Sequence, residues 1–173
     1  MNIKIMKALI LKLILQIEIF KLKKKEAAGE KVTYPKYEVK GGVLHHGAGD
    51  WDFERVNLSH KNRWGFKSSL GFYIGYNKFL GYDGVVHIGR RDGEQGAHTI
   101  GPIPYFHNRH YIGICLQGNT EEKEPTAEQL ISLRQELDEY KKKGIEFEGH
   151  RDIQATLCPG KYLYEWLQEY KGH

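Results

Sequence analysis

The chain has 173 residues, of which 40% are hydrophobic and 28% charged, and its formal net charge is +4. This length suits one domain with its own core, and the composition argues against an integral membrane bundle and against a disordered chain. The mild positive charge favours an anionic partner such as bacterial wall polymer, but it is equally compatible with a role in solubility alone.

The first 25 residues are apolar and basic, and their pattern predicts an amphipathic helix. The apolar face is wider than a two-stranded coiled-coil seam, so residues 3–22 should be buried in a homo-oligomer, against the domain or at a membrane surface. Lys12, Gln16 and Glu18 argue against a membrane span, whereas Ala27-Ala28-Gly29 would serve as a signal-peptide cleavage site. The seam positions follow a 3-4-3-4-3 spacing: Ile3, Met6, Ile10, Leu13, Ile17 and Phe20.

Residues 26–40 read as a linker, and residues 41–173 as the catalytic domain. A strand over residues 41–46 ends at His45 and His46, which alternation places on opposite faces. We expect a helix from Phe53 to Trp64 and a strand from Gly71 to Leu80. A turn at Asp83-Gly84 then leads into a strand over residues 85–89. Residues 90–111 form polar and irregular loops of the kind that line a groove.

The second half alternates between strands and helices. Residues 111–116 predict a buried strand in which Cys115 is a free thiol, so we expect no disulfide with Cys158. Thr126 and Gln129 form a capping box for a helix that ends before Gly144. A strand over residues 145–149 and a helix over residues 162–167 follow. The whole predicts an α/β fold, a mixed central sheet flanked by helices, with the extra N-terminal amphipathic helix.

Three potential zinc ligands follow strands of this sheet. His45 ends the first strand, His150 ends a later strand, and Cys158 lies in the loop after it. Two imidazoles and a thiolate leave one tetrahedral position open, as in catalytic rather than structural zinc sites. Zinc-activated water hydrolyses amides and esters. The pattern therefore predicts a zinc hydrolase.

Short pieces spread over about residues 41–170 resemble the zinc-dependent N-acetylmuramoyl-L-alanine amidases. That family includes phage lysozyme-amidases, bacterial type 2 amidases and peptidoglycan recognition proteins. Each piece is weak alone, but together, in the family's order, they are specific. The pieces are Val43-Leu44-His45-His46, Gly75-Tyr76 with Gly84, Gly96-Ala97-His98, the run from Ile112 to Asn119, the run from Pro125 to Gln129, Gly149-His150-Arg151-Asp152 and the run from Thr156 to Gly160.

The resemblance implies Zn²⁺ on His45, His150 and Cys158, and it makes Tyr76 the active-site tyrosine. Thr156 occupies a position that is lysine in some phage members, so it would stabilise an oxyanion only through a neutral hydrogen bond. We assign Tyr76 and Thr156 as catalytic.

The same resemblance suggests that two further histidines contact the substrate. We expect His98 to line the substrate groove and His46 to bind substrate, with a supporting structural role as the alternative for His46. No carboxylate is clearly placed as general base, although Glu94 lies in a suitable loop.

The expected activity is cleavage of the amide bond between N-acetylmuramic acid and L-alanine of peptidoglycan, as in a phage-type endolysin. The expected partner is peptidoglycan, with no nucleic acid. One alternative is a recognition module that binds without cleaving, although such members of the family typically lack a zinc ligand. The other is a membrane-acting or assembling protein driven by its N-terminal helix. The site of action is either the host cell wall, reached from the cytoplasm, or the wall of a secreting cell.

Overall fold

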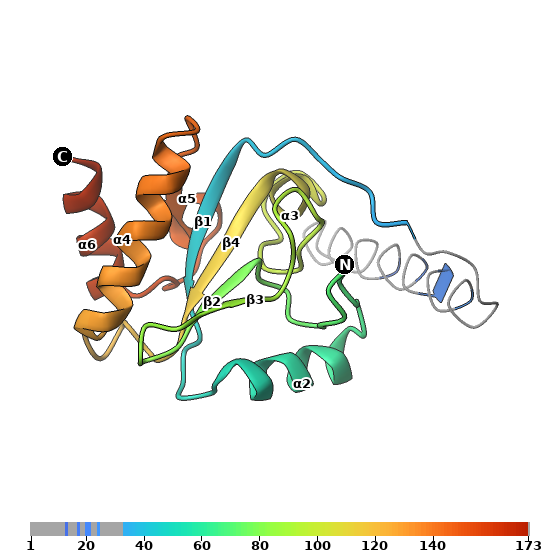
Figure 1. Cartoon of the computed structure of the whole chain (residues 1–173), viewed down its shortest axis with the longest axis horizontal. Coiled ribbons are helices and arrows are strands. Elements are labelled where there is room, and N and C mark those ends of the chain that lie inside the picture. The colour runs from blue at the N-terminus through green and yellow to red at the C-terminus, as the bar shows by residue number, and fades with distance from the viewer. Residues whose placement is uncertain (1–12, 14–16, 18–19, 22–23, 25–32, 173) are drawn as a thin grey trace.

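A computed structural model describes residues 13, 17, 20, 21, 24 and 33–172 (Figure 1). Most of the predicted helix over residues 1–25 lies outside the described residues, as does the first part of the linker, so both stay predictions. Residues 33–40 contain one isolated bridge, from Lys36 to Glu94, and no helix. Within the described part of the chain, no helix is both long and apolar enough to cross a bilayer.

A mixed five-stranded sheet forms the centre of the domain, in the order β3-β2-β4-β1-β5. β1 (Gly41–His46) lies parallel to β4 (Tyr111–Leu116) and to β5 (Phe147–Gly149). β2 (Lys78–Leu80) is parallel to β4, and β3 (Val86–Ile88) is antiparallel to β2. The predicted mixed α/β sheet is therefore confirmed.

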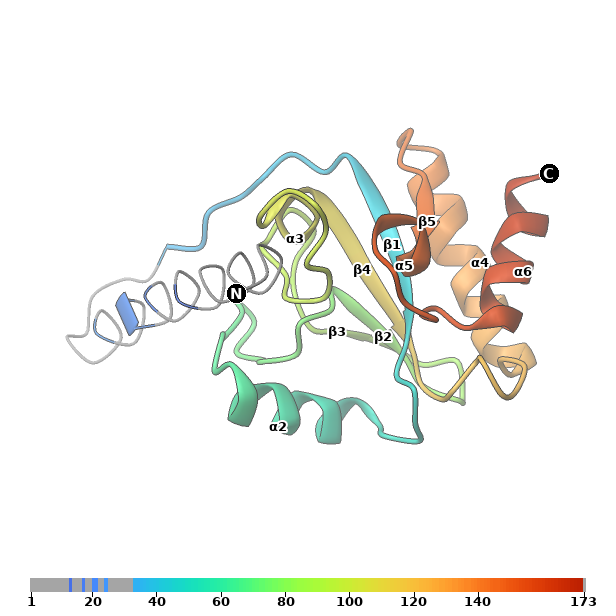
Figure 2. The same cartoon turned by 180° about the vertical axis from the view of Figure 1, so that it is seen from behind.

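Helices cover both faces of the sheet (Figures 1 and 2). α4 (Ala127–Lys141) and α6 (Lys161–Lys171) lie side by side on one face, and α2 (Phe53–Arg63) lies on the other. Strand alternation separates the two cores, since neighbouring residues point to opposite faces. The larger core under α4 and α6 includes Leu44, Ile112, Ile114, Leu116, Leu133, Leu137, Leu163 and Leu167. The smaller core beside α2 consists of Phe53, Val56, Ile74, Phe79 and Cys115.

The same alternation determines the side of the sheet to which His45 of β1 points. His45 pairs in register with Cys115 of β4, which belongs to the core beside α2. His45 therefore points to that side of the sheet, and Leu44 points into the larger core. Cys115 is fully buried and both cysteines are free, as expected.

The predicted start of α4 is confirmed in detail. Thr126 Oγ1 accepts the N–H of Gln129, and Gln129 Oε1 accepts the N–H of Thr126, each at 3.1 Å. The Gln129 side chain also reaches the sheet, where its Nε2 donates to the carbonyls of Leu80 and Gln117. This buried amide holds the first turn of α4 against the carboxyl ends of β2 and β4.

Three elements differ from the sequence prediction. The strand expected from Gly71 to Leu80 forms only over its last three residues, in β2. The expected loop contains a short helix, α3 (Phe106–His110). His150 does not end the strand β5 but begins a helical turn, α5 (His150–Ile153). Asp152 supports this turn, because its carboxylate accepts the N–H of Gly149 at 2.8 Å.

Candidate metal centre

The predicted ligands converge at the carboxyl end of β1. The ligand atoms of His45, His150 and Cys158 all lie within 4.8 Å of one another. His45 comes from β1, His150 from the first turn of α5, and Cys158 from the loop between α5 and α6. Parallel pairing of β1 with β5 is what brings these distant segments together, since the carboxyl ends of parallel strands share one edge of the sheet.

His45 presents different nitrogens to different neighbours. Its Nδ1 lies 3.6 Å from the Sγ of Cys158, and its Nε2 lies 3.0 Å from the Nδ1 of His98. Its ring centroid is 4.5 Å from that of His150. Burial lowers the pKa of His45 well below its usual value, and the neighbouring histidines add to the effect. A neutral ring at working pH is the form that binds a metal.

His150 provides the test of whether a metal fits here. Within the described part of the chain, its Nε2 is buried and has no hydrogen-bond partner. A buried polar atom without a partner is costly unless something else satisfies it. Burial also lowers the pKa of His150, so the ring is neutral near pH 7. The donor set of two imidazoles and a thiol matches the chemistry of a zinc site.

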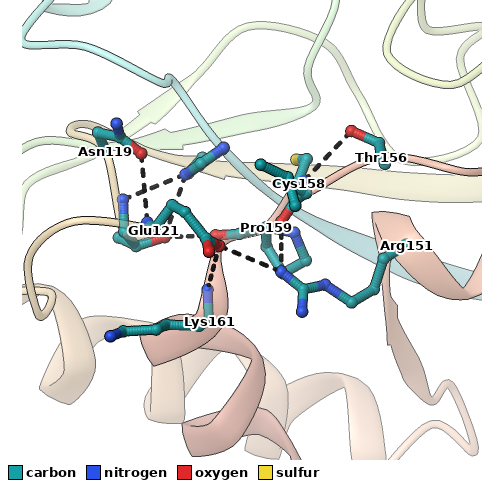
Figure 3. Close-up of polar contacts among 10 residues, drawn as sticks. Asn119, Glu121, Arg151, Thr156, Cys158, Pro159 and Lys161 are labelled. Atoms are coloured by element: carbon teal, nitrogen blue, oxygen red, sulfur yellow. Dashed lines mark hydrogen bonds and ion pairs between the residues drawn. The ribbon is translucent and has the colours of Figure 1, made fainter.

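The Cys158 loop is tied to the segment that follows β4 (Figure 3). Thr120 Oγ1 donates to the carbonyl of Pro159, and Glu121 accepts the N–H of Lys161 at 2.8 Å. Gly160 makes this approach possible, because it has φ +88° and a Cβ there would lie 2.3 Å from the carbonyl carbon of Thr120. Burial raises the pKa of the Cys158 thiol to about 12.

Arg151 and Glu121 support the same loop, and the sequence pattern does not predict this pair. The guanidinium of Arg151 donates to the Leu157 carbonyl and lies 3.4 Å from the Glu121 carboxylate. Figure 3 shows Glu121 between Arg151 and Lys161. Arg151 stood in the quoted motif beside His150, but no spacing rule indicates that Glu121 lies opposite it.

Tyr76 packs against His45, and its catalytic role stays a prediction. Its ring centroid lies 5.2 Å from that of His45. Tyr76 precedes β2 rather than belonging to the strand. Burial raises the pKa of Tyr76 well above its usual value, and the Cys115 and Cys158 side chains raise it further, Cys115 also through a hydrogen bond. The hydroxyl is therefore a neutral donor at any working pH.

Thr156 lies beside Cys158 in the loop between α5 and α6. Its Oγ1 accepts the N–H of Cys158 at 3.2 Å, which leaves the hydroxyl proton to donate elsewhere. The side chain is half-buried. The structure thus gives Thr156 a contact that shapes the loop, while its catalytic role stays a prediction.

His98 is buried against His45 and does not lie on an open surface. Its Nδ1 lies 3.0 Å from both His45 Nε2 and the Thr99 hydroxyl, and its Nε2 lies 3.3 Å from the Tyr111 carbonyl. Burial lowers its pKa to about 3. The backbone is held by Asn108, whose Oδ1 accepts the N–H groups of His98 and Thr99. The predicted contact of His98 with substrate stays a prediction.

His46 points away from His45 and reaches the segment after β4. Its Nδ1 accepts the N–H of Thr120 at 3.1 Å. This bond links the end of β1 to the segment that also holds the Cys158 loop. The contact corresponds to the structural alternative stated for His46, and its substrate-binding role stays a prediction.

Glu94 is committed to other contacts. One carboxylate oxygen accepts the N–H of Ser69 at 2.7 Å, and the other accepts the Ser69 hydroxyl at 2.8 Å. Glu94 lines a hollow of about 840 Å³, together with Tyr34, Lys36, Lys78 and Arg91 among others. None of the predicted ligands lines this hollow, so it is separate from the metal centre.

The chain is similar in sequence to proteins of one known family. The family model described as N-acetylmuramoyl-L-alanine amidase matches residues 35–161. Peptidoglycan recognition protein 1 of Mus musculus is 34% identical over 144 residues, which is 76% of this chain and 75% of the mouse protein. Peptidoglycan-recognition protein SD of Drosophila melanogaster is 32% identical over 137 residues, covering 74% of this chain and 71% of the fly protein.

Solved structures of related proteins share the fold. N-acetylmuramoyl-L-alanine amidase LysC from Clostridium intestinale URNW aligns with a TM-score of 0.65 at 24% identity, over 82% of this chain and 94% of that chain. A second match is the ectodomain complex of peptidoglycan recognition proteins LCa and LCx with bound tracheal cytotoxin. It aligns with a TM-score of 0.63 at 28% identity, over 80% of this chain and 87% of that chain.

Proposed function

Because the chain belongs to the N-acetylmuramoyl-L-alanine amidase family, we propose that it cleaves the amide bond between N-acetylmuramic acid and L-alanine in peptidoglycan. The observation that supports catalysis best is the complete ligand set. His45, His150 and Cys158 place their donor atoms within 4.8 Å of one another. The buried Nε2 of His150, which has no partner in the described part of the chain, supports a metal as its missing neighbour.

We propose zinc as the metal that these three side chains hold. A bound Zn²⁺ supplies an acidified water and polarises a carbonyl oxygen. The nitrogen and sulfur donors favour zinc over magnesium or calcium, which prefer oxygen ligands. Three protein ligands leave the open position that catalytic zinc sites keep.

The surrounding residues would stabilise the negative charge that develops on the scissile carbonyl oxygen. Tyr76 is a neutral donor beside His45, and Thr156 retains a hydroxyl proton beside Cys158. Donors that are fixed before the reaction stabilise such charge without reorganisation. Tyr76 is held by packing against His45 and by its hydrogen bond with Cys115, and Thr156 is held by its bond to the Cys158 N–H, so both side chains have fixed positions.

A recognition module is the second candidate function, because the relatives reported above are named peptidoglycan recognition proteins. Binding without cleavage needs no complete ligand set. The presence of all three donors therefore favours the enzyme, and peptidoglycan is the proposed partner in either case.

The deciding experiment is mass spectrometry of purified peptidoglycan after digestion. We expect the full chain to release free stem peptides that begin with L-alanine. A chelator should stop the release, and added Zn²⁺ should restore it. Binding to peptidoglycan without released stem peptides would contradict the proposal and support the recognition module.

The narrower prediction of a phage-type endolysin also belongs to this proposal. Expression inside a bacterial host, together with a pore-forming protein, should lyse the cells if the enzyme works from the cytoplasm outward. Deletion of residues 1–25, followed by measurement of oligomeric state and liposome binding, tests the role predicted for the N-terminal helix.

A further inference from the structure

We infer that His98 is a positioning residue that fixes the tautomer of His45, so that His45 carries its proton on Nε2 and offers the Nδ1 lone pair to a metal. The inference rests on the proposed metal centre for its purpose, but the tautomer is a property of the protein alone. It follows from a chain of contacts that runs from the backbone of β4 through His98 to His45.

The first step is the contact between His98 and the backbone. The Nε2 of His98 lies 3.3 Å from the carbonyl oxygen of Tyr111. A carbonyl oxygen only accepts hydrogen bonds, so the nitrogen that faces it must carry a proton. In a neutral imidazole one nitrogen is a donor and the other an acceptor. The Nδ1 of His98 is therefore an acceptor.

The second step concerns the contact between His98 and His45, which determines the tautomer of His45. The Nδ1 of His98 lies 3.0 Å from the Nε2 of His45. Because His98 Nδ1 accepts, His45 Nε2 must donate, and its proton is thereby fixed. The other nitrogen, Nδ1, is left with its lone pair, and it is the one that lies 3.6 Å from Cys158 Sγ. The Thr99 hydroxyl lies beside both rings and can donate or accept, so it does not alter this direction.

The packing around His98 holds its ring in this orientation. A Cβ at Gly96 or Gly113 would lie 2.6 or 2.7 Å from ring carbons of His98. Only glycine leaves room for the ring between these two segments. Asn108 holds the backbone on the same side by accepting two consecutive N–H groups. Partners of this kind orient metal ligands and set their tautomer.

The direct test is nuclear magnetic resonance of the full chain with ¹⁵N-labelled histidine, in the metal-free state at neutral pH. Long-range nitrogen–proton correlations distinguish the two tautomers. We expect His45 to show a protonated Nε2 and an unprotonated Nδ1, and His98 to show the same pattern. A proton on Nδ1 of His45 would overturn the inference.

Variants of His98 test its consequence for zinc affinity. His98→Leu removes the acceptor, whereas His98→Asn keeps an oxygen acceptor near the position of Nδ1. We expect His98→Leu to weaken Zn²⁺ binding about 10- to 100-fold in competition with a chelator, and His98→Asn to weaken it less. His87→Leu, which alters a half-buried histidine stacked on Phe53, is the matched control and should bind as the wild type does.

Equal losses in the two His98 variants would assign the effect to packing and overturn the inference, as would wild-type affinity in His98→Leu. If His98→Leu does not fold, the resonance measurement on the unaltered chain still decides. If the wild type binds no Zn²⁺, the proposed metal centre fails, and the tautomer measurement tests the inference independently.

Discussion

Cys158 is the residue on which the proposed chemistry depends most directly. Its thiol is neutral near pH 7 because burial raises its pKa, so a metal must displace its proton. We predict that Cys158→Ser loses peptidoglycan cleavage. Its loss of Zn²⁺ affinity should exceed the roughly 100-fold that changes in outer-shell partners cost. Metal content by mass spectrometry and release of stem peptide measure the two effects.

The other cysteine provides a matched control for this prediction. Cys115 is buried in the core beside α2 and is not one of the clustered ligands. Cys115→Ala should therefore keep one Zn²⁺ per chain. Full wall digestion by Cys158→Ser would remove zinc catalysis from consideration.

The Tyr76 hydroxyl is predicted to act on the rate rather than on the metal. Tyr76→Phe keeps the ring that packs against His45 and removes only the donor. We expect kcat to fall about 100-fold, the usual effect of removing one oxyanion donor, with unchanged Zn²⁺ affinity. Tyr73→Phe, three positions earlier and in contact with Lys61, is the control and should retain full activity. Equal rates for Tyr76→Phe and the wild type would assign Tyr76 to packing alone.

At the level of elements, Glu121 connects the segment after β4 to the start of α6. Its carboxylate accepts the first N–H of that helix and pairs with Arg151. Glu121→Gln should lower the free energy of unfolding by about 1 kcal/mol, because a negative charge at a helix N-terminus is stabilising. Urea denaturation measures this, with the exposed neighbour Glu122→Gln as the control. Equal free energies of unfolding for the two variants would show that the Glu121 carboxylate does not stabilise the fold.

The strand predicted over residues 71–80 shows where sequence patterns stop being informative. The N–H groups of Tyr73 and Ile74 are accepted by Asn57 Oδ1, and that of Gly75 by His60 Nδ1. Side chains of α2 thus replace a neighbouring strand as hydrogen-bond partners. Alternation of apolar and polar residues in the sequence indicates which residues are buried, but it does not indicate which groups accept hydrogen bonds from their backbone N–H groups.

The helix α3 was missed for a related reason. It has five residues, too few for a helical period to be visible among prolines and histidines. Within α3, the Asn108 side chain accepts the N–H groups of His98 and Thr99. This is a tertiary contact, which a local sequence pattern does not reveal. By contrast, the capping box of α4 and the buried strand β4 were predictable, since each depends on residues close together in the sequence.

The site was partly predictable in the same sense. The residue types of His45, His150 and Cys158 indicated zinc chemistry, and the structure brings them together, although His150 begins a helical turn instead of ending a strand. The support provided by His98 and Glu121 arises from segments far apart in the chain, which only folding brings together.

The whole molecule is predicted to be acid-labile when no metal is bound. Burial is the first cause that lowers the pKa of these histidines: His45, His46, His60, His98, His107 and His150. A histidine whose pKa is lowered by folding binds protons more readily in the unfolded state. The contribution of these histidines to the free energy of unfolding is therefore fully present above about pH 6.5. It is lost as the pH drops towards their pKa values in the folded state, such as about 4 for His60.

Denaturation of the metal-free protein between pH 8 and pH 4 tests this, and His60 allows one contribution to be isolated. His60→Asn keeps an acceptor for the Gly75 N–H but cannot titrate. Over this pH range the wild type should lose up to about 3 kcal/mol more free energy of unfolding than the variant. Solvent screening of the half-buried ring makes the actual difference smaller. A stability that stays constant from pH 7 to pH 5 in the wild type would contradict the prediction.

The place of β1 in the sheet order has a consequence for biosynthesis. β1 is the first strand among the residues that the structure describes, yet its neighbours in the sheet are β4 and β5. Its ligand His45 emerges 113 residues before Cys158. At the usual rate of synthesis this interval is on the order of ten seconds, and β1 has no sheet partner until β4 has been translated. The three clustered side chains of the candidate metal centre can therefore come together only after Cys158 has been translated.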